Sequence, residues 1–458
     1  MKPLPCFMLI LILPLLCPAE ELSLEKALSL ALEQGESVLL KRSELLSVRF
    51  DLAGARSRAL PSLELESSAS WMINPPEGIT VEAGSLGELP NPDPPPDFFP
   101  MPSEEVVFME DAENTYFKLS VVLTQPLFTW SKIKNAIDIA GSDLEIARWE
   151  LIRTEREVRR EVTGAYFSTL LALESRRLLE EARDVMEEVL QDKQESYEAG
   201  IVNWLTVLEG KSRLAEIERR VWEASESYQT GLEALSFFTG LDSRDLRLVT
   251  PFREELPRID VDALQRGTVD GWPEREILKE KVFKARKNLA VKKGGGLFKP
   301  DLSFIIQWDI TGRHIPFTEE DWTRTWNHNL TLSLGTSVVL FDSLSSHWKV
   351  KSAAEELNSA VLGLTQIEKS LALKLRQAVR DVRVGYYSVL EKESRLFEAE
   401  ELYKNVRVSY ENELITREEE RQARVFLTGV LLDYRLTLFE YEMALAELEY
   451  LTGKELAF

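Results

Sequence analysis

Side chains able to do acid–base or metal chemistry are few in this sequence of 458 residues. Its histidines are His314, His328 and His347, and no carboxylate pair stands near them at metal-ligand spacing. The stretch KKGGGLFKP, which begins at Lys292, superficially resembles a phosphate-binding loop. It lacks the preceding strand and the Lys-Ser/Thr ending that such a loop uses. We therefore expect no catalytic residue, no metal site and no cofactor, and we expect that the protein is not an enzyme.

Both cysteines lie in an N-terminal segment with the features of a secretory signal peptide, predicted to cover residues 1–19. Its apolar core, residues 7–16, is too short to span a bilayer as a helix. Removal of Cys6 and Cys17 with this segment would leave no disulfide and no cysteine metal site. Cys17 could instead carry a lipid anchor, although the bulky Leu16 before it disfavours that alternative.

The composition indicates a folded and strongly acidic protein. Hydrophobic residues make up 44% and charged residues 29% of the chain, which is a folded composition. The formal net charge is -22. Such a surface repels DNA and RNA, so we expect no nucleic-acid partner.

An internal repeat organises the chain. The tripeptide Ser-Tyr-Glu occurs at Ser196 and again at Ser409, 213 residues later. The same offset aligns many other positions without a gap, among them Phe128 with Phe341, Ala140 with Ala353, Leu144 with Leu357, Tyr197 with Tyr410, Tyr228 with Tyr441 and Gly240 with Gly453. Upstream, PSLEL at Pro61 matches PDLSF at Pro300, which places an insertion in the first copy between Trp71 and Asn114. The sequence therefore predicts one structural unit written twice.

Each copy contains a predicted long helix, at about 131–199 and 345–412. Apolar residues recur at every seventh position, with Lys392 as the one charged exception. The positions are Ile137, Leu144, Leu151, Val158, Ala165, Ala172, Leu179 and Met186, then Val350, Leu357, Leu364, Leu371, Ala378, Gly385, Lys392 and Ala399. A strict seven-residue repeat is typical of a supercoil of helices. A second helix follows in each copy, at about 204–238 and 417–451. By itself this pattern favours an ordinary coiled coil.

Alternating segments before each long helix argue for more than a coiled coil. Strands are predicted at about 63–72, 115–128, 301–309 and 329–341. Strands of about 9–11 residues with apolar and polar residues in alternation have the length that crosses an outer membrane at a tilt. Tryptophans near the strand ends fit an aromatic girdle or, alternatively, a soluble sheet edge: Trp71, Trp130, Trp308, Trp322, Trp326 and Trp348. Four strands cannot close a barrel, so several chains must share one.

Six motifs, in this order and spacing, carry a resemblance to a known family: LSLEKALSLALEQGESVLL, ALPSLELESS, TQPLFTWSKIKNAI, GAYFSTLLALE, SYEAGIVNWLTVLEGK and ALAELEYLTGKEL. Over about residues 20–453 the chain resembles the TolC family of outer-membrane efflux proteins. The resemblance implies an α+β membrane protein of two structural repeats. It also implies a homotrimer in which a twelve-stranded β-barrel in outer-membrane lipid continues as a twelve-helix α-barrel in the periplasm.

The resemblance implies a division of the chain and a function. Residues 20–240 and 274–453 would be the two repeats, 241–273 an equatorial linker and 454–458 a C-terminal tail. The protein would be the exit duct of a tripartite efflux pump or type I secretion system in the cell outer membrane. Its partners would be a periplasmic adaptor protein and an inner-membrane pump of the RND, ABC or MFS class.

The resemblance also implies site residues at the helix tips. The adaptor-docking tips would be Gly200, Ile201 and Val202 in the first copy and Leu414 and Ile415 in the second, where the glycine is missing. The periplasmic gate would use the charged run after the second tip. Glu419 occupies the position of the family's first ring acid, the neutral Gln422 that of the second, and Arg417 and Arg421 would pair with carboxylates of a neighbouring helix.

Two other function classes stay open at this point. One is a secreted coiled-coil structural protein without a pore. The other is a surface adhesin that uses the proline-rich loop within residues 72–114.

Overall fold

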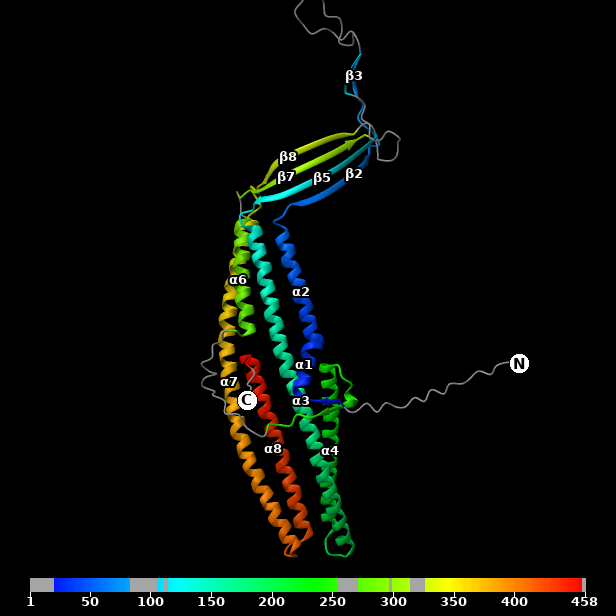
Figure 1. Cartoon of the computed structure of the whole chain (residues 1–458), viewed down its shortest axis with the longest axis vertical. Coiled ribbons are helices and arrows are strands. Elements are labelled where there is room, and N and C mark those ends of the chain that lie inside the picture. Colours follow the sequence, from blue (N-terminus) through cyan, green and yellow to red (C-terminus); the bar gives the residue numbers. More distant parts are fainter. Residues whose placement is uncertain are drawn as a thin grey trace, which may run out of the picture. The chain divides into compact units, whose positions relative to one another are not determined.

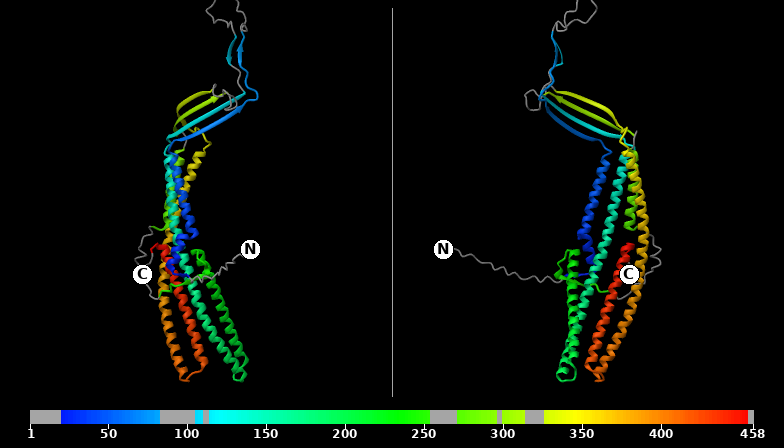
Figure 2. Two further views of the ribbon diagram at one scale, coloured as in Figure 1. Left: turned by 45° about the vertical axis from the view of Figure 1, so that its right-hand side comes forward. Right: turned by 180° about the vertical axis from the view of Figure 1, so that it is seen from behind.

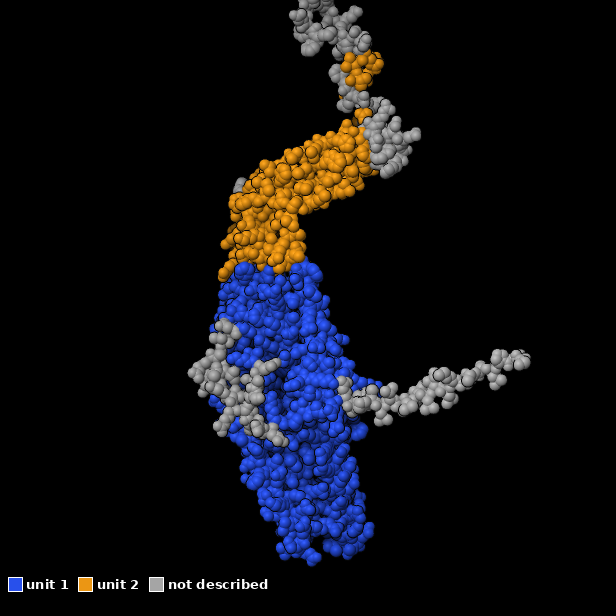
Figure 3. Space-filling view, in the orientation of Figure 1, with its two compact units in different colours: residues 1–50, 141–284, 357–458 blue, residues 51–140, 285–356 orange. Residues whose placement is uncertain are grey.

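The computed structural model describes residues 20–82, 105–109, 114–253, 271–295, 299–313 and 326–454. The chain divides into two compact units, which Figure 3 colours separately. Unit 1 comprises residues 1–50, 141–284 and 357–458, and unit 2 comprises residues 51–140 and 285–356. The predicted signal peptide, most of the proline-rich loop, and His314 and Trp322 lie outside the described residues.

The elements follow one another in an order that the repeat explains. Two short strands pair in parallel, β1 (Glu20–Leu22) and β6 (Leu246–Leu248), and two more, β3 (Ile79–Val81) and β4 (Val106–Met109), pair antiparallel. The four longer strands are β2 (Ser62–Trp71), β5 (Thr115–Phe128), β7 (Asp301–Gly312) and β8 (Asn327–Ser337). The helices are α1 (Leu24–Gln34), α2 (Glu36–Ser57), α3 (Lys132–Glu198), α4 (Trp204–Thr239), η1 (Ser243–Asp245), α6 (Pro273–Gly294), α7 (Ser345–Glu411) and α8 (Arg417–Thr452).

Unit 2 contains an antiparallel sheet of four strands in the order β2-β5-β7-β8, which Figure 1 shows side by side. The register places like side chains opposite one another. One row across the sheet is Leu65, Val121, Trp308 and Leu330, and the adjacent row is Glu66, Ser120, Asp309 and Asn329. Because successive residues of a strand point to opposite faces, the sheet has one apolar face and one polar face.

The strand β8 ends four residues before the predicted limit of 341. Ser337 is opposite Asp301, the first residue of β7, and Pro300 precedes it. Proline has no N–H with which to continue a ladder, so residues 338–341 have no partner strand there. Among the described residues, no helix is both long and apolar enough to cross a membrane.

The helices repeat at the same offset as the sequence. The helices α3 and α7 have 67 residues each, and α4 and α8 have 36 each. Both views of Figure 2 show α4 alongside α3 and α8 alongside α7, with the two connecting turns at the same end of unit 1. Backbone conformation follows the repeat too, since residues with positive φ pair at the 213-residue offset: Trp130 with Ser343, Ser131 with Leu344, Gly200 with Glu413 and Gly240 with Gly453.

The heptad positions of α3 and α7 are covered by other elements. None of the sixteen is exposed, and Val158, Leu179, Leu371 and Ala399 are among those that are buried. The charged exception, Lys392, lies 2.8 Å from Asp433 of α8, with which it forms an ion pair. Burial of the apolar stripe is what joins the long helices to their neighbours.

Tyr166 of α3 connects the strand β1 and the segment after β6 to the core of unit 1. Its side chain is fully buried, and its hydroxyl donates to the carbonyl oxygen of Leu22 at 3.1 Å. The same hydroxyl accepts from the backbone N–H of Thr250 at 2.8 Å. Phe167 beside it stacks on Phe252, with ring centroids 5.5 Å apart. The β1–β6 pair is thereby attached to the middle of α3.

Candidate functional site at the helix tips

The first tip is the turn between α3 and α4. Gly200 has φ of 70° there, in the left-handed region that glycine adopts without strain. Its N–H donates to the carbonyl of Tyr197 at 2.9 Å, and the N–H of Ile201 donates to that of Ser196 at 2.8 Å. The side chain of Asn203 then caps α4. The turn leaves the side chain of Ile201 76% exposed.

The second tip, between α7 and α8, has the same geometry. Glu413 takes the place of Gly200, with φ of 59°. Its N–H donates to Tyr410 at 2.9 Å, and the N–H of Leu414 donates to Ser409 at 2.9 Å. Leu414 is 75% exposed, almost the same fraction as Ile201. The missing glycine therefore changes the sequence of the second tip but not the course of its backbone.

Val202 and Ile415 are half-buried at the two tips. Within the two turns, Ile201 and Leu414 are the apolar side chains most exposed to solvent. The rings of Tyr197 and Trp204, which flank the first tip in the chain, lie 5.3 Å apart. An exposed apolar side chain on a hydrogen-bonded turn is suited to contact with another protein.

Glu419 has a local partner at the start of α8. Its carboxylate accepts from the backbone N–H of Thr416 at 2.8 Å, and the N–H of Glu419 donates to the Thr416 hydroxyl at 3.3 Å. This reciprocal pattern is a capping box, which satisfies donors at a helix start. The hydrogen bond from the Thr416 backbone holds the pKa of the Glu419 carboxyl below its ordinary value. Glu419 is therefore ionised at neutral pH.

Arg421 joins the two helical hairpins. Its guanidinium lies 2.7 Å from the carboxylate of Glu188 and also pairs with that of Asp192, both on α3. The Arg421 side chain is only 11% exposed, whereas those of Glu188 and Asp192 are 62% and 40% exposed. Lys193 of α3 adds a second contact at 3.5 Å from Glu418. Arg421 thus pairs with carboxylates of another helix of the same chain.

Arg417 and Gln422 have partners closer in sequence. The Arg417 Nε atom donates to the hydroxyl of Tyr410 at 3.2 Å, across the turn. The amide nitrogen of Gln422 donates to the carboxylate of Glu418 at 3.2 Å, one helical turn earlier. Both side chains are exposed.

Sequence reasoning missed the acidic partners of Arg421 and the cap of Glu419. Glu188 and Asp192 are four residues apart on α3, a spacing that places two carboxylates on one helix face. The pattern Thr416-x-x-Glu419 was a readable capping-box signal. Among the described residues, no group of three or more His, Cys, Asp and Glu side chains is arranged to hold a metal ion.

The comparison with known families gives this geometry its context. Residues 27–241 match the outer membrane efflux protein family. The match covers 215 of the 458 residues, which is most of the first repeat. This efflux protein is an exit duct of the outer membrane and extends into the periplasm. The match disfavours the two alternatives of a secreted coiled coil and an adhesin. No curated protein matches the sequence.

Solved structures agree with the fold of the efflux protein. The CmeC outer membrane channel of Campylobacter jejuni superimposes with a TM-score of 0.74 at 15% identity, over 94% of this chain and 85% of that one. VceC from Vibrio cholerae gives 0.67 at 15% identity, over 94% and 96%. The open state of the MtrE channel of Neisseria gonorrhoeae gives 0.64 at 14% identity, over 94% and 88%. At these identities the likeness concerns the fold.

Proposed function

We propose that three copies of this chain form one duct, through which an inner-membrane pump and a periplasmic adaptor pass substrates to the outside. The observation that supports this proposal is that both edge strands of the four-stranded sheet have a free edge in the described part of the chain. Within the described residues, β2 pairs only with β5 and β8 only with β7. An unpaired edge cannot lie in lipid, because its backbone groups have no water to bond. Pairing of β8 with β2 of the next copy closes a twelve-stranded barrel.

The two faces of the sheet support the same arrangement. The apolar face includes Leu65, Val121, Trp308 and Leu330, and Leu65 and Leu330 are largely exposed in the single chain. Lipid would cover that face. The polar face would line a water-filled duct.

The tips of both hairpins are the proposed docking site for the adaptor. Their exposed side chains, Ile201 and Leu414, project from two turns of the same geometry. Three copies would present six such turns, which alternate between first and second tips. The pump that the adaptor brings would be of the RND, ABC or MFS class.

The charged run at the start of α8 is the proposed gate. Glu419 from three copies would form an acidic ring, while the neutral Gln422 leaves a second ring uncharged. Arg421 would hold the gate closed by tying α8 to α3 through Glu188 and Asp192. Arg417 would restrain the turn through Tyr410. An adaptor that inserts between the hairpins would have to break these pairs. The proposed role is transport without catalysis.

Oligomeric state and conduction test the proposal. Native mass spectrometry of the purified protein in detergent should give a trimer, and planar bilayers should show discrete conductance steps. A monomer that stays dispersed without detergent and conducts no ions would instead support the coiled-coil alternative.

A further inference from the structure

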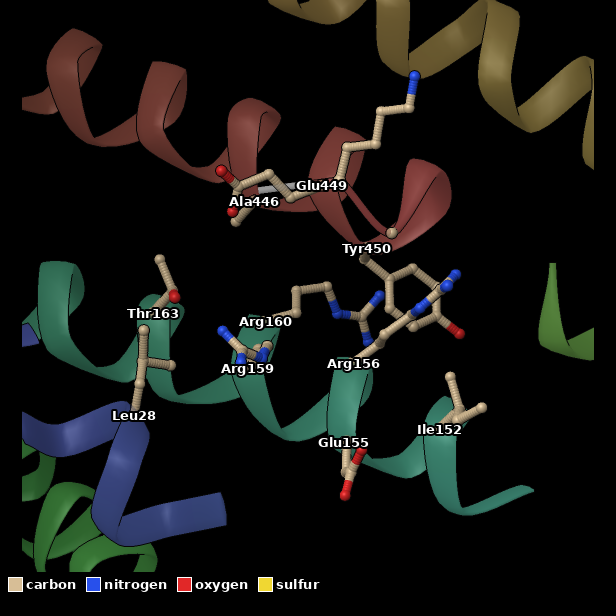
Figure 4. A pocket seen from close by; sticks show the side chains of 12 residues that line it. Leu28, Ile152, Glu155, Arg156, Arg159, Arg160, Thr163, Ala446, Glu449 and Tyr450 are labelled. Atoms are coloured by element: carbon tan, nitrogen blue, oxygen red, sulfur yellow. The ribbon is translucent and has the colours of Figure 1, made fainter. Parts of the chain in front are cut away.

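An arginine-rich pocket lies in unit 1 between α3 and the C-terminal end of α8, far along α3 from the tips. Its volume is about 230 Å³. Leu28 of α1 closes one side, and Figure 4 shows Arg160 directed from α3 toward Tyr450 of α8. Since one water molecule needs roughly 10–15 Å³ of such a cavity, the pocket has room for a small organic ion.

Positive charge predominates in the lining, although the chain as a whole carries a net charge of -22. The charged lining residues are four cations and two carboxylates: Arg156, Arg159, Arg160 and Lys454, with Glu155 and Glu449. The three arginines fall at positions i, i+3 and i+4 of α3, so they share one helix face and repel one another. Such a cluster is stabilised when an anion lies among its members.

Arg160 is held in place by the residues around it. Its Nη1 atom donates to Glu447 at 2.9 Å, and its guanidinium lies over the ring of Tyr450, 4.8 Å from the centroid. A guanidinium has five N–H donors, so one hydrogen bond does not exhaust it. The guanidinium of Arg160 is therefore oriented before any ligand binds.

The guanidinium of Arg156 has a buried nitrogen without a hydrogen-bond acceptor in the described part of the chain. Its Nη1 atom is buried and has no hydrogen-bond partner among the residues that the structure describes. Burial lowers the pKa of this guanidinium, and the negative charge of Glu274 opposes that change only in part. A buried donor without an acceptor is costly, and an oxyanion is the acceptor that a guanidinium binds best.

Gly453 makes room for this guanidinium. It ends α8 with φ of 64°, and a Cβ atom built on it would overlap the Nη2 atom of Arg156. The guanidinium thus lies directly against the backbone where α8 ends. A larger residue at this position would force the guanidinium of Arg156 to shift.

We propose that this pocket binds a small oxyanion, a phosphate or a carboxylate, through the guanidinium groups of Arg156 and Arg160. The anion bridges α3 and the end of α8 and stabilises their contact. The pocket lies within one chain and takes no residue from the proposed gate or docking tips, so the site stands independently of them.

Titration calorimetry on the purified protein in detergent tests the site, with inorganic phosphate and citrate as probes and ionic strength held constant with chloride. Saturable binding of at least one probe is expected, and the tighter one identifies a phosphate or a carboxylate ligand. Arg156→Met should weaken binding at least about tenfold, because a charge-assisted hydrogen bond is lost. Arg177→Met is the matched control on α3, since its side chain is 81% exposed and outside the pocket.

The proposal is overturned if neither probe binds wild-type protein more tightly than chloride does. It is also overturned if Arg156→Met binds as wild type does, which would place the ion elsewhere. If Arg156→Met fails to assemble, Arg156→Lys is the second variant. It keeps the positive charge and loses the planar guanidinium that can donate two parallel hydrogen bonds. That variant should bind several-fold more weakly, and an unchanged affinity contradicts the assigned geometry.

Discussion

Arg421 of α8 pairs with Asp192 of α3, although 229 residues separate them in the chain. The pair joins one helical hairpin to the other close to both tips. The guanidinium is buried while the carboxylate stays partly exposed. Loss of the arginine therefore leaves acids that water can still solvate, and loss of the acids leaves a buried cation.

Arg421→Met should loosen the tips. The substitution keeps the aliphatic stem and removes the pairs with Glu188 and Asp192, so we expect a loss of about 1–3 kcal/mol in the free energy of unfolding. In planar bilayers the open probability should rise. The exposed Arg177→Met is the control and should change neither quantity. Unaltered gating in a folded Arg421→Met protein would show that the constriction lies elsewhere.

Glu413→Gly should stabilise the protein. Glu413 has φ of 59°, a conformation that glycine adopts without strain, so the change should raise the free energy of unfolding by about 0.5–1 kcal/mol. The reverse experiment, Gly200→Ala, should lower it by a similar amount. Thermal unfolding of both variants beside wild type measures the effect. Equal midpoints would mean that the two turns relax at no cost.

Glu419 should contribute stability that depends on pH. Its pKa is lowered in the folded state, so the contribution is complete above the pKa of the unfolded state, about 4.3, and is lost as the pH falls through the pKa of the folded state. Glu419→Gln keeps an acceptor for Thr416 and removes this dependence. Thermal unfolding over a range of acidic pH compares the two proteins. If Glu419 only caps the helix, Glu419→Gln should leave ion flow unchanged. If Glu419 is part of an acidic ring, Glu419→Gln should weaken cation block from the periplasmic side.

The two faces of the sheet should respond differently to one added charge. Leu332 and Ser333 are neighbours on the edge strand β8 and point to opposite faces. Leu332→Arg would place a cation in lipid, at a cost of up to about 2–4 kcal/mol near the bilayer centre, while Ser333→Arg would face the duct. The amount of heat-modifiable trimer in outer membranes measures assembly. Equal yields from both variants would argue against the assigned faces.

Ile201→Asp and Leu414→Asp should abolish transport and leave the trimer intact. Each change places a charge on an apolar side chain that is exposed at a tip, where it would oppose docking. Asn203→Asp is the matched control, because it adds the same charge to the first tip and still caps α4. Substrate export in cells and cross-linking to the adaptor measure the outcome. Normal export by both variants would place the docking surface elsewhere.

The sequence alone determined the repeat and the elements within it. Heptads mark the covered side of a helix and alternation marks the two faces of a strand, since both periods follow from local backbone geometry. Glu413 lies 213 residues after Gly200 and has the same left-handed conformation, although a glutamate by itself does not indicate one. The capping box at Thr416 was equally local and could have been read.

Tertiary structure decided which surfaces meet. The charged sequence around Arg421 does not predict Glu188 or Asp192 as its partners. A periodic pattern indicates that one side of a helix is covered, but it does not indicate which helix covers it. The same holds for Arg156, whose spacing to Arg160 is visible in the sequence and whose contact with Gly453 is not. The end of β8 at Ser337 likewise depended on where its partner strand begins. Distant segments pair only when the folded chain brings them together, and local residue propensities do not predict which segments these are.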